Sequence, residues 1–411
     1  RPAPGDPPAA AAADLEAQAP APRPEAAGVV QGREPVWDNL KGICVLLVVI
    51  IHTLRTFEQE VVAEGHVASG LILPLLFVVM PAFAFAAGHL SSPLDGSRRK
   101  AVALLRTWAT FFLAQLTYAA FWALWAGGWQ ERSIGSEGTR SLAALAAWGR
   151  GRPKEPFAFW HQPLPGVTWF LFCLAAWRTA LPLLVLLRRP VACAVTLGAL
   201  SQLTDTGRIG FVQPALCFLP FFMAGYRHPR GVLAKEPPRL LRHAFWGVVA
   251  ACLALSLASP LLPGGAGTFD VVAGLAWTSY GCLYGGAVGE SLARHGATCH
   301  SAAGPVGFIA FVIIALPLLR CFLAVVPRRT VFGVTRAGVL SVYIYLFHLY
   351  ALVVGKAAVL RAVDAAQQRD AFQAFLRGRL ALPAGVVAAV ALWGLLATGV
   401  LRPVFRLCVE P

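Results

Sequence analysis

The sequence predicts an all-α protein, a polytopic transmembrane helical bundle of about ten spans. Of its 411 residues, 57% are hydrophobic and only 13% are charged, about half the charged share of a soluble globular domain. The mean hydropathy is +0.64, and apolar runs follow one another from Leu40 to Phe405. A soluble core does not need so much apolar surface, whereas a set of helices that face lipid does.

The first segment, residues 1–33, is rich in Ala and Pro and contains few large apolar side chains. Such a stretch cannot bury a core, so we expect a disordered tail. The segment also lacks the apolar stretch of a signal peptide. Residues 34–408 are then expected to form one membrane domain.

Ten apolar runs have about the length of a membrane-spanning helix. The hydrocarbon core of a bilayer is about 30 Å thick, which requires roughly 20 apolar residues in a helix. The ten runs lie at 40–57, 68–90, 101–126, 167–187, 190–204, 209–226, 243–263, 304–326, 337–356 and 382–404. A further range, 271–289, is Gly-rich and could be an eleventh span, a re-entrant piece or an outer loop.

Basic residues in the short connections predict a cytoplasmic N-terminus, because Lys and Arg concentrate on the cytoplasmic side of a membrane protein. They gather in 91–100 and 227–242, whereas 58–64, after the first run, is acidic. Ten spans also place the arginines of 328–336 inside, and eleven would place them outside. The basic segment 356–381 disagrees, since ten spans put it outside.

The longest hydrophilic connection, 127–165, contains Trp129, Trp148, Trp160 and His161. Its place in the predicted topology is on the outer face. It could bind an acceptor or cover it as a lid, or its tryptophans could form an interfacial aromatic belt. Both interpretations stay open.

The formal net charge of +15 would suggest nucleic-acid binding in a soluble chain. Here the basic residues form short clusters between apolar runs, which is typical of charge that sets membrane topology, so no nucleic-acid partner is expected. Most of the nine cysteines lie inside apolar runs, without a CxxC or Cys/His spacing. They are expected to be small buried hydrophobes, and no metal site is predicted.

The first apolar run carries ionisable side chains, which are costly inside a membrane and therefore indicate function. They are Asp38, Lys41 and His52. Lys41 and His52 are eleven positions apart, about three helical turns, so both lie on one face about 16 Å apart along the axis. Asp38 lies within about 40° of the same face.

Two interpretations of this face are open from its spacing alone. A histidine in a low-dielectric environment is neutral and can accept a proton from a hydroxyl, while Lys41 holds a phosphate or pairs with Asp38. Alternatively, Lys41 extends its ammonium group to the interface and His52 only hydrogen bonds to a neighbouring helix.

The stretch from Asp38 to His52 resembles the opening signature of the membrane acyltransferase-3 superfamily, most closely its fucose 4-O-acetylase-like branch. That signature is a basic residue, ten intervening residues and a histidine. Five later stretches resemble the family's motifs in the same order: Phe83–Gly88, the basic residues Arg98, Arg99 and Arg106, Trp169–Leu171, Phe218–Tyr226 and Ser341–His348. Two positions depart from the pattern, since Ala87 replaces the usual serine and Ala103 removes the Arg-x-x-Arg pair near Arg106.

The resemblance implies O-acyl transfer, usually of an acetyl group, from cytosolic acyl-CoA to a hydroxyl of a sugar, glycan or glycolipid. It makes His52 the base or transient acyl acceptor, with Asp38 orienting Lys41. The candidates for binding the donor's phosphates are Lys41, Arg99 and Arg106. Acyl-CoA (acetyl-CoA) is then a substrate, and no permanently bound cofactor is expected.

Candidate substrate-binding residues by the same resemblance are Trp169, Tyr343 and His348. The aromatic run around His348 could stack a sugar or form an interfacial belt. A transporter is the main alternative function and predicts an internal repeat with broken helices, which the sequence does not show. A sensor that uses the fold without catalysis is a third. The expected location is a bacterial inner membrane or a eukaryotic secretory membrane; the sequence leaves the acyl group, the acceptor and the oligomeric state open.

Overall fold

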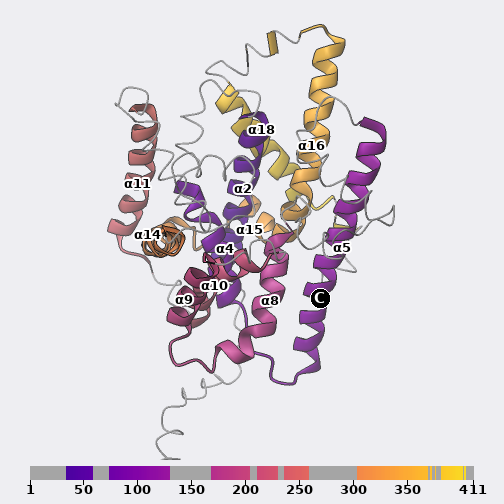
Figure 1. Ribbon diagram of the computed structural model, residues 1–411. Helices are drawn as coiled ribbons and strands as arrows, with labels where there is room; N and C mark the ends of the chain where they lie inside the picture. Colours follow the sequence, from indigo (N-terminus) through magenta and orange to yellow (C-terminus); the bar gives the residue numbers. More distant parts are fainter. Residues whose placement is uncertain are drawn as a thin grey trace, which may run out of the picture. The chain divides into compact units, whose positions relative to one another are not determined.

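The computed structural model describes residues 34–58, 74–129, 168–203, 211–229, 236–258, 303–368 and 381–400, with 371, 372, 375, 402 and 403. All regular secondary structure among them is helical, so the all-α class is confirmed (Figure 1). The predicted tail, the range 271–289 and the segment 130–165 lie outside the described residues. Those from Pro35 onward belong to one compact unit.

In chain order, the described helices are α2 (Pro35–Glu58), α4 (Val79–His89), α5 (Arg98–Trp129), α8 (Trp169–Leu184), α9 (Pro190–Ser201), α10 (Val212–Arg227), α11 (Arg239–Ala258), α14 (Ala303–Val325), α15 (Phe332–Val339), α16 (Ser341–Ala365) and α18 (Ala381–Ala397). A helix occupies each of the ten ranges predicted as spans. The range 337–356 is divided, because the backbone leaves the helical conformation at Leu340.

Three helices within the described residues are long and apolar enough to cross a membrane: Pro35–Leu54, Gly304–Val325 and Ser341–Ala365. Others are apolar but shorter, such as α9 with 12 residues. A helix of that length is about 18 Å long and does not reach across a core of about 30 Å by itself. The count of ten crossings therefore stays a prediction.

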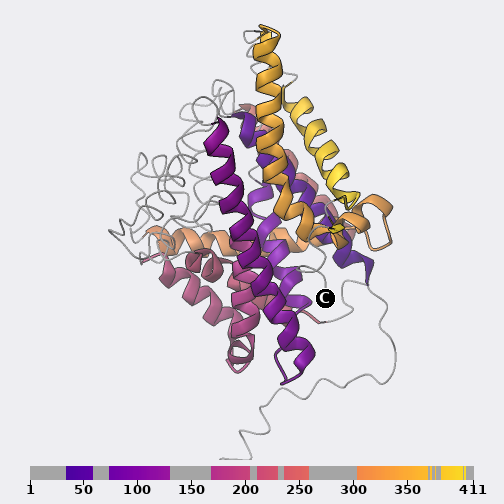
Figure 2. The ribbon, with the colours of Figure 1, turned by 90° about the vertical axis from the view of Figure 1, so that its right-hand side faces the viewer.

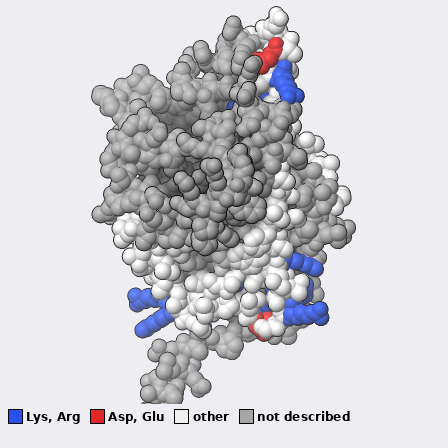
Figure 3. Space-filling model, turned by 45° about the vertical axis from the view of Figure 1, so that its right-hand side comes forward, with Lys and Arg blue, Asp and Glu red and all other residues white. Residues whose placement is uncertain are grey.

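Large apolar side chains on the outer helices are exposed, among them Leu105, Leu116, Leu240 and Ile313. On the face shown in Figure 3, the described Lys and Arg side chains gather toward the lower and upper ends, and the described surface between them is uncharged. Exposed apolar surface between charged ends is what a bilayer requires of its protein.

Helix α2 is one of the interior helices of the described bundle. It contacts α4, α15, α16 and α18, and 67% of the residues in its apolar window are buried, compared with 39% in α16. Helix α16 lies beside α18 (Figure 2), and α5 packs against α8.

Two helix pairs meet backbone to backbone at glycines. A side chain at Gly338 of α15 would collide with the carbonyl oxygen of Asp38, and one at Gly42 of α2 with that of Val334. Helices α4 and α10 make the same reciprocal contact at Gly88 and Gly225. Small residues allow this close approach, which is a main source of helix association in membranes.

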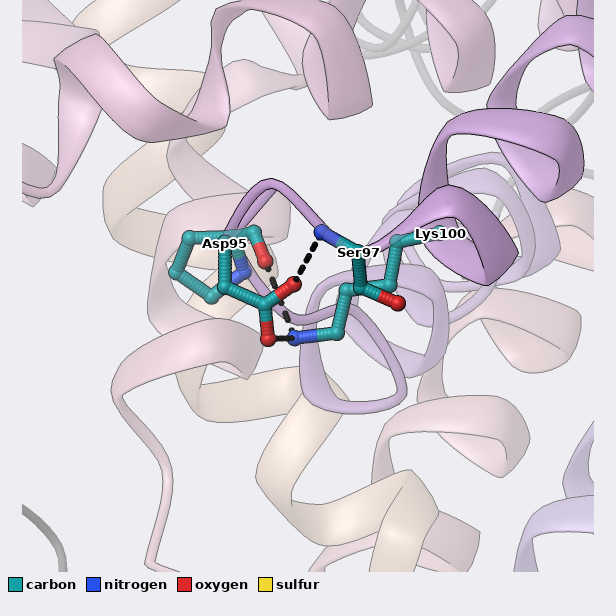
Figure 4. Close-up of polar contacts among 4 residues, drawn as sticks. Asp95, Ser97 and Lys100 are labelled. Carbon is teal, nitrogen blue, oxygen red and sulfur yellow. Dashed lines mark hydrogen bonds and ion pairs between the residues drawn. The ribbon is translucent and has the colours of Figure 1, made fainter.

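The connection before α5 is a hydrogen-bonded turn (Figure 4). Asp95 accepts hydrogen bonds from the Ser97 amide at 3.1 Å and from the Lys100 ammonium at 2.6 Å, and Lys100 also donates to the Pro93 carbonyl at 3.2 Å. The hydrogen bond from Lys100 lowers the pKa of the Asp95 carboxyl below its usual value. One of the basic residues of 91–100 is thus held by a local acid.

Replacing Gly338 by alanine should lower the stability of the bundle by about 1–3 kcal/mol, as overpacking does, because the added methyl group meets the Asp38 carbonyl. Gly355→Ala on α16 is the matched control, since its new Cβ has open space and alanine favours a helix. The measurement is the unfolding midpoint of each purified protein in one detergent. Equal stability of the two variants would contradict the close contact.

Candidate active site

The bundle brings two histidines together at the centre of the described helices. His52 of α2 and His348 of α16 have ring centroids 5.1 Å apart, with their planes tilted by 52°. Helices α2 and α16 contact each other. The sequence named both residues, but only the packing of α2 against α16 makes them a pair.

His348 is fully buried, with 0% of its surface exposed. Its Nδ1 lies 2.8 Å from the Tyr345 carbonyl oxygen and 3.2 Å from that of Ile344. Carbonyl oxygens only accept hydrogen bonds, so Nδ1 carries the proton, and Nε2 of the neutral ring is an acceptor. Among the described residues, Nε2 has no hydrogen-bond partner. Buried polar atoms are normally paired, so this nitrogen departs from the usual pattern.

An aromatic chain connects Trp169 to the histidine pair. The rings of Trp169 and Phe170 lie 5.8 Å apart, those of Phe170 and Tyr345 6.0 Å, and those of Tyr345 and His348 6.2 Å. Two rings therefore stand between Trp169 and His348. Tyr345 belongs to the aromatic run that the sequence places around His348, but it is not among the predicted site residues, although residues three apart share a helix face.

Tyr343, the tyrosine named from the sequence, is buried on α16. It precedes His348 by five residues, which places it about 140° around the helix from that histidine. Its face of α16 is therefore not the face that carries His348 and Tyr345.

Lys41 and Asp38 form an ion pair at the start of α2, with Lys41 Nζ 2.9 Å from Asp38 Oδ1. The Lys41 side chain keeps 23% of its surface exposed, whereas the Asp38 side chain keeps 4%. Asp38 thus orients a cation that still reaches the surface of the bundle. Arg99 and Arg106 are exposed on α5, and they belong to neither this ion pair nor the histidine pair.

Asn39, which lies between Asp38 and Lys41 in the sequence, hydrogen bonds α2 to the connection that follows α14. Its amide nitrogen donates to the carbonyl oxygens of Pro327 and Arg329, both at 2.8 Å. Its amide oxygen accepts a hydrogen bond of 2.6 Å from the Thr335 hydroxyl. Asn39 is fully buried, so it holds the ion pair and the connection in one arrangement.

Comparison with protein families gives one match: a family model described as an acyltransferase domain, of the acyltransferase-3 type, covers residues 35–398. That range includes the ion pair of α2 and the histidine pair. Searches of curated proteins and of solved structures found no match.

Replacing Asn39 by leucine should destabilise the protein by about 1–3 kcal/mol for each buried group left without a partner. The Pro327 and Arg329 carbonyls lose their donor. Thr398→Ala is the control, since its hydroxyl bonds only to Leu395 of its own helix on an exposed face. Chemical unfolding in detergent measures both. A loss no larger for Asn39→Leu than for the control would disprove the role of Asn39.

Proposed function

The chain belongs to this family of acyltransferase domains, and we propose that it is an integral membrane O-acyltransferase that uses acyl-CoA. It moves an acyl group, acetyl in the simplest case, to a hydroxyl of a sugar, glycan or glycolipid. Acyl-CoA approaches from the cytoplasmic side, where the N-terminus lies. The acceptor meets the donor at the histidine pair inside the bundle.

The observation that carries this proposal is the pair of His52 and His348. In this pair, Nε2 of His348 has no hydrogen-bond partner among the described residues. Acyl transfer to a hydroxyl needs a group that takes the hydroxyl proton as the oxygen attacks. A neutral imidazole does so when its other nitrogen is held by a hydrogen bond that fixes the tautomer. The Nδ1 contact of His348 with the Tyr345 carbonyl fixes the tautomer of that ring, so its Nε2 can hold the acceptor while the neighbouring His52 takes the proton.

The two histidines have different tasks in the proposed reaction. His52, which is only partly buried, takes the proton from the acceptor hydroxyl while the oxygen attacks the thioester carbon. The C–S bond then breaks, and the coenzyme A thiolate leaves and regains a proton from the His52 imidazolium. His348 Nε2 accepts a hydrogen bond from the acceptor and orients it against His52.

The ion pair at the start of α2 supports the donor's position. Lys41 lies about 16 Å along the helix axis from His52. Coenzyme A carries its phosphates and its thioester at opposite ends of a long flexible arm, so the two ends can contact Lys41 and His52 together. Arg99 and Arg106, exposed on α5, attract the anionic donor to this side of the membrane at longer range.

His52→Ala should lower the rate of acyl transfer about 10²- to 10⁴-fold, the usual contribution of a general base. The assay follows labelled acetyl-CoA with purified protein in detergent and reports transfer and hydrolysis. His243→Ala is the control, because His243 is exposed on α11 and should leave the rate unchanged. No donor turnover in the wild type, or equal turnover in His52→Ala, refutes the proposed function.

His348→Leu should raise the acceptor KM at least tenfold, because the acceptor loses its hydrogen bond to Nε2. His348→Gln, whose side-chain oxygen still accepts a hydrogen bond, should recover part of that loss. Initial rates at varied acceptor and saturating donor measure both variants. If the two variants shift KM equally, His348 does not bind the acceptor through Nε2.

A further inference from the structure

A second group of unpaired polar atoms lies away from the histidine pair, in the connection between α14 and α15. Arg328 Nη2 donates a long hydrogen bond of 3.4 Å to the Leu323 carbonyl. Its Nε and Nη1 are buried without a hydrogen-bond partner in the described part of the chain. Buried guanidinium N–H groups without an acceptor cost free energy, so this site is suited to an anion.

The surroundings of Arg328 are positive. Burial and then the nearby Arg242 of α11 lower the pKa of Arg328, and Glu236 offsets part of this effect. Arg320 lies on α14 three residues before Leu323, so it shares the helix face onto which Arg328 folds back. Three guanidinium groups with a single carboxylate among them attract phosphate strongly.

A wall of flat rings comes from the start of α2, the end of α4 and the residue after α10. His228, which follows α10, lies 5.3 Å from Phe85 and 6.0 Å from His89, edge to face, and His89 stacks on Trp37 at 4.2 Å. His228 Nε2 is buried and has no hydrogen-bond partner within the described ranges. Burial first and then Arg320 lower the pKa of His228, so this ring lies near Arg320.

Asn39 places this basic and aromatic group beside α2. It binds the carbonyl oxygens on either side of Arg328, those of Pro327 and Arg329. Arg328 is therefore held at the first turns of the helix that carries Lys41, at the opposite end from His52. Asn39 and His52 are about 20 Å apart along the axis.

We propose that Arg328, Arg320 and Arg242, with the rings of Trp37, His89 and His228, bind the phosphates and the base of the nucleotide-linked acyl donor. This inference rests on the proposed acyltransferase function. Arg328 is the principal phosphate ligand, because its N–H groups are buried and unpaired. The ring wall favours a nucleotide over the phosphate of a lipid headgroup, since aromatic side chains stack on bases.

The test measures binding of coenzyme A itself, without turnover, by calorimetry on the full-length protein in nanodiscs of zwitterionic lipid. Arg328→Gln should weaken binding about 10- to 100-fold, as expected when hydrogen bonds to a charged group are lost. The neighbouring Arg329 is exposed, and Arg329→Gln is the matched control, with a change below threefold. Pantetheine, which lacks the nucleotide, should bind equally to wild type and Arg328→Gln.

Three further measurements distinguish this proposal from its alternatives. His52→Ala should lose transfer but keep coenzyme A binding, so failure of the catalytic proposal is distinguished from failure of this one. Arg320→Gln, at an exposed position, should weaken binding even if Arg328→Gln does not fold. A second set of measurements uses discs of anionic phosphatidylglycerol. If Arg328→Gln binds coenzyme A as wild type does but loses the stabilisation that this lipid gives wild type, the site binds a lipid headgroup and the proposal is overturned. Absence of coenzyme A binding by the wild type would overturn it as well.

Discussion

The arrangement of the site depends on how closely α2 lies against α15. Their backbones meet at Gly42 and Gly338, where any side chain would strike a carbonyl oxygen of the other helix. Asn39 adds hydrogen bonds to the connection that leads into α15. Lipid offers little hydrophobic gain for bringing helices together, so close packing and interhelical hydrogen bonds do so. This contact therefore fixes the position and rotation of α2, which carries most of the polar site.

The positions of the polar groups along α2 reflect the free-energy cost of placing a charge in a low dielectric. Near the start of the helix, Asp38 is ionised but paired with a lysine that reaches the surface. Deeper in the bundle, His52 meets His348, and an imidazole can be neutral there. An unpaired buried charge costs the most free energy. An anionic donor therefore suits the start of α2, near Lys41. Proton transfer between neutral groups suits the interior, near His52 and His348.

Much of the fold can be predicted from the sequence, because apolar runs of about twenty residues have few alternatives to a helix in a membrane. The shared face of Lys41 and His52 follows from helical spacing alone. Their partners do not, since periodicity within one segment carries no information on which helix packs against it. That is why His348 is a candidate by resemblance, while its pairing with His52 emerges only from the packed bundle.

The position of Arg328 in the sequence does not determine its role. An arginine between apolar runs is interpreted as topogenic, and an exposed arginine such as Arg329 fits that interpretation. Burying the N–H groups of Arg328 adds a desolvation cost that orientation in the membrane does not require. No carboxylate of the described chain forms an ion pair with Arg328, and Glu236 offsets only part of the burial. The proposed donor phosphate would offset the rest. On this proposal, two adjacent arginines with the same charge differ in function because they differ in burial.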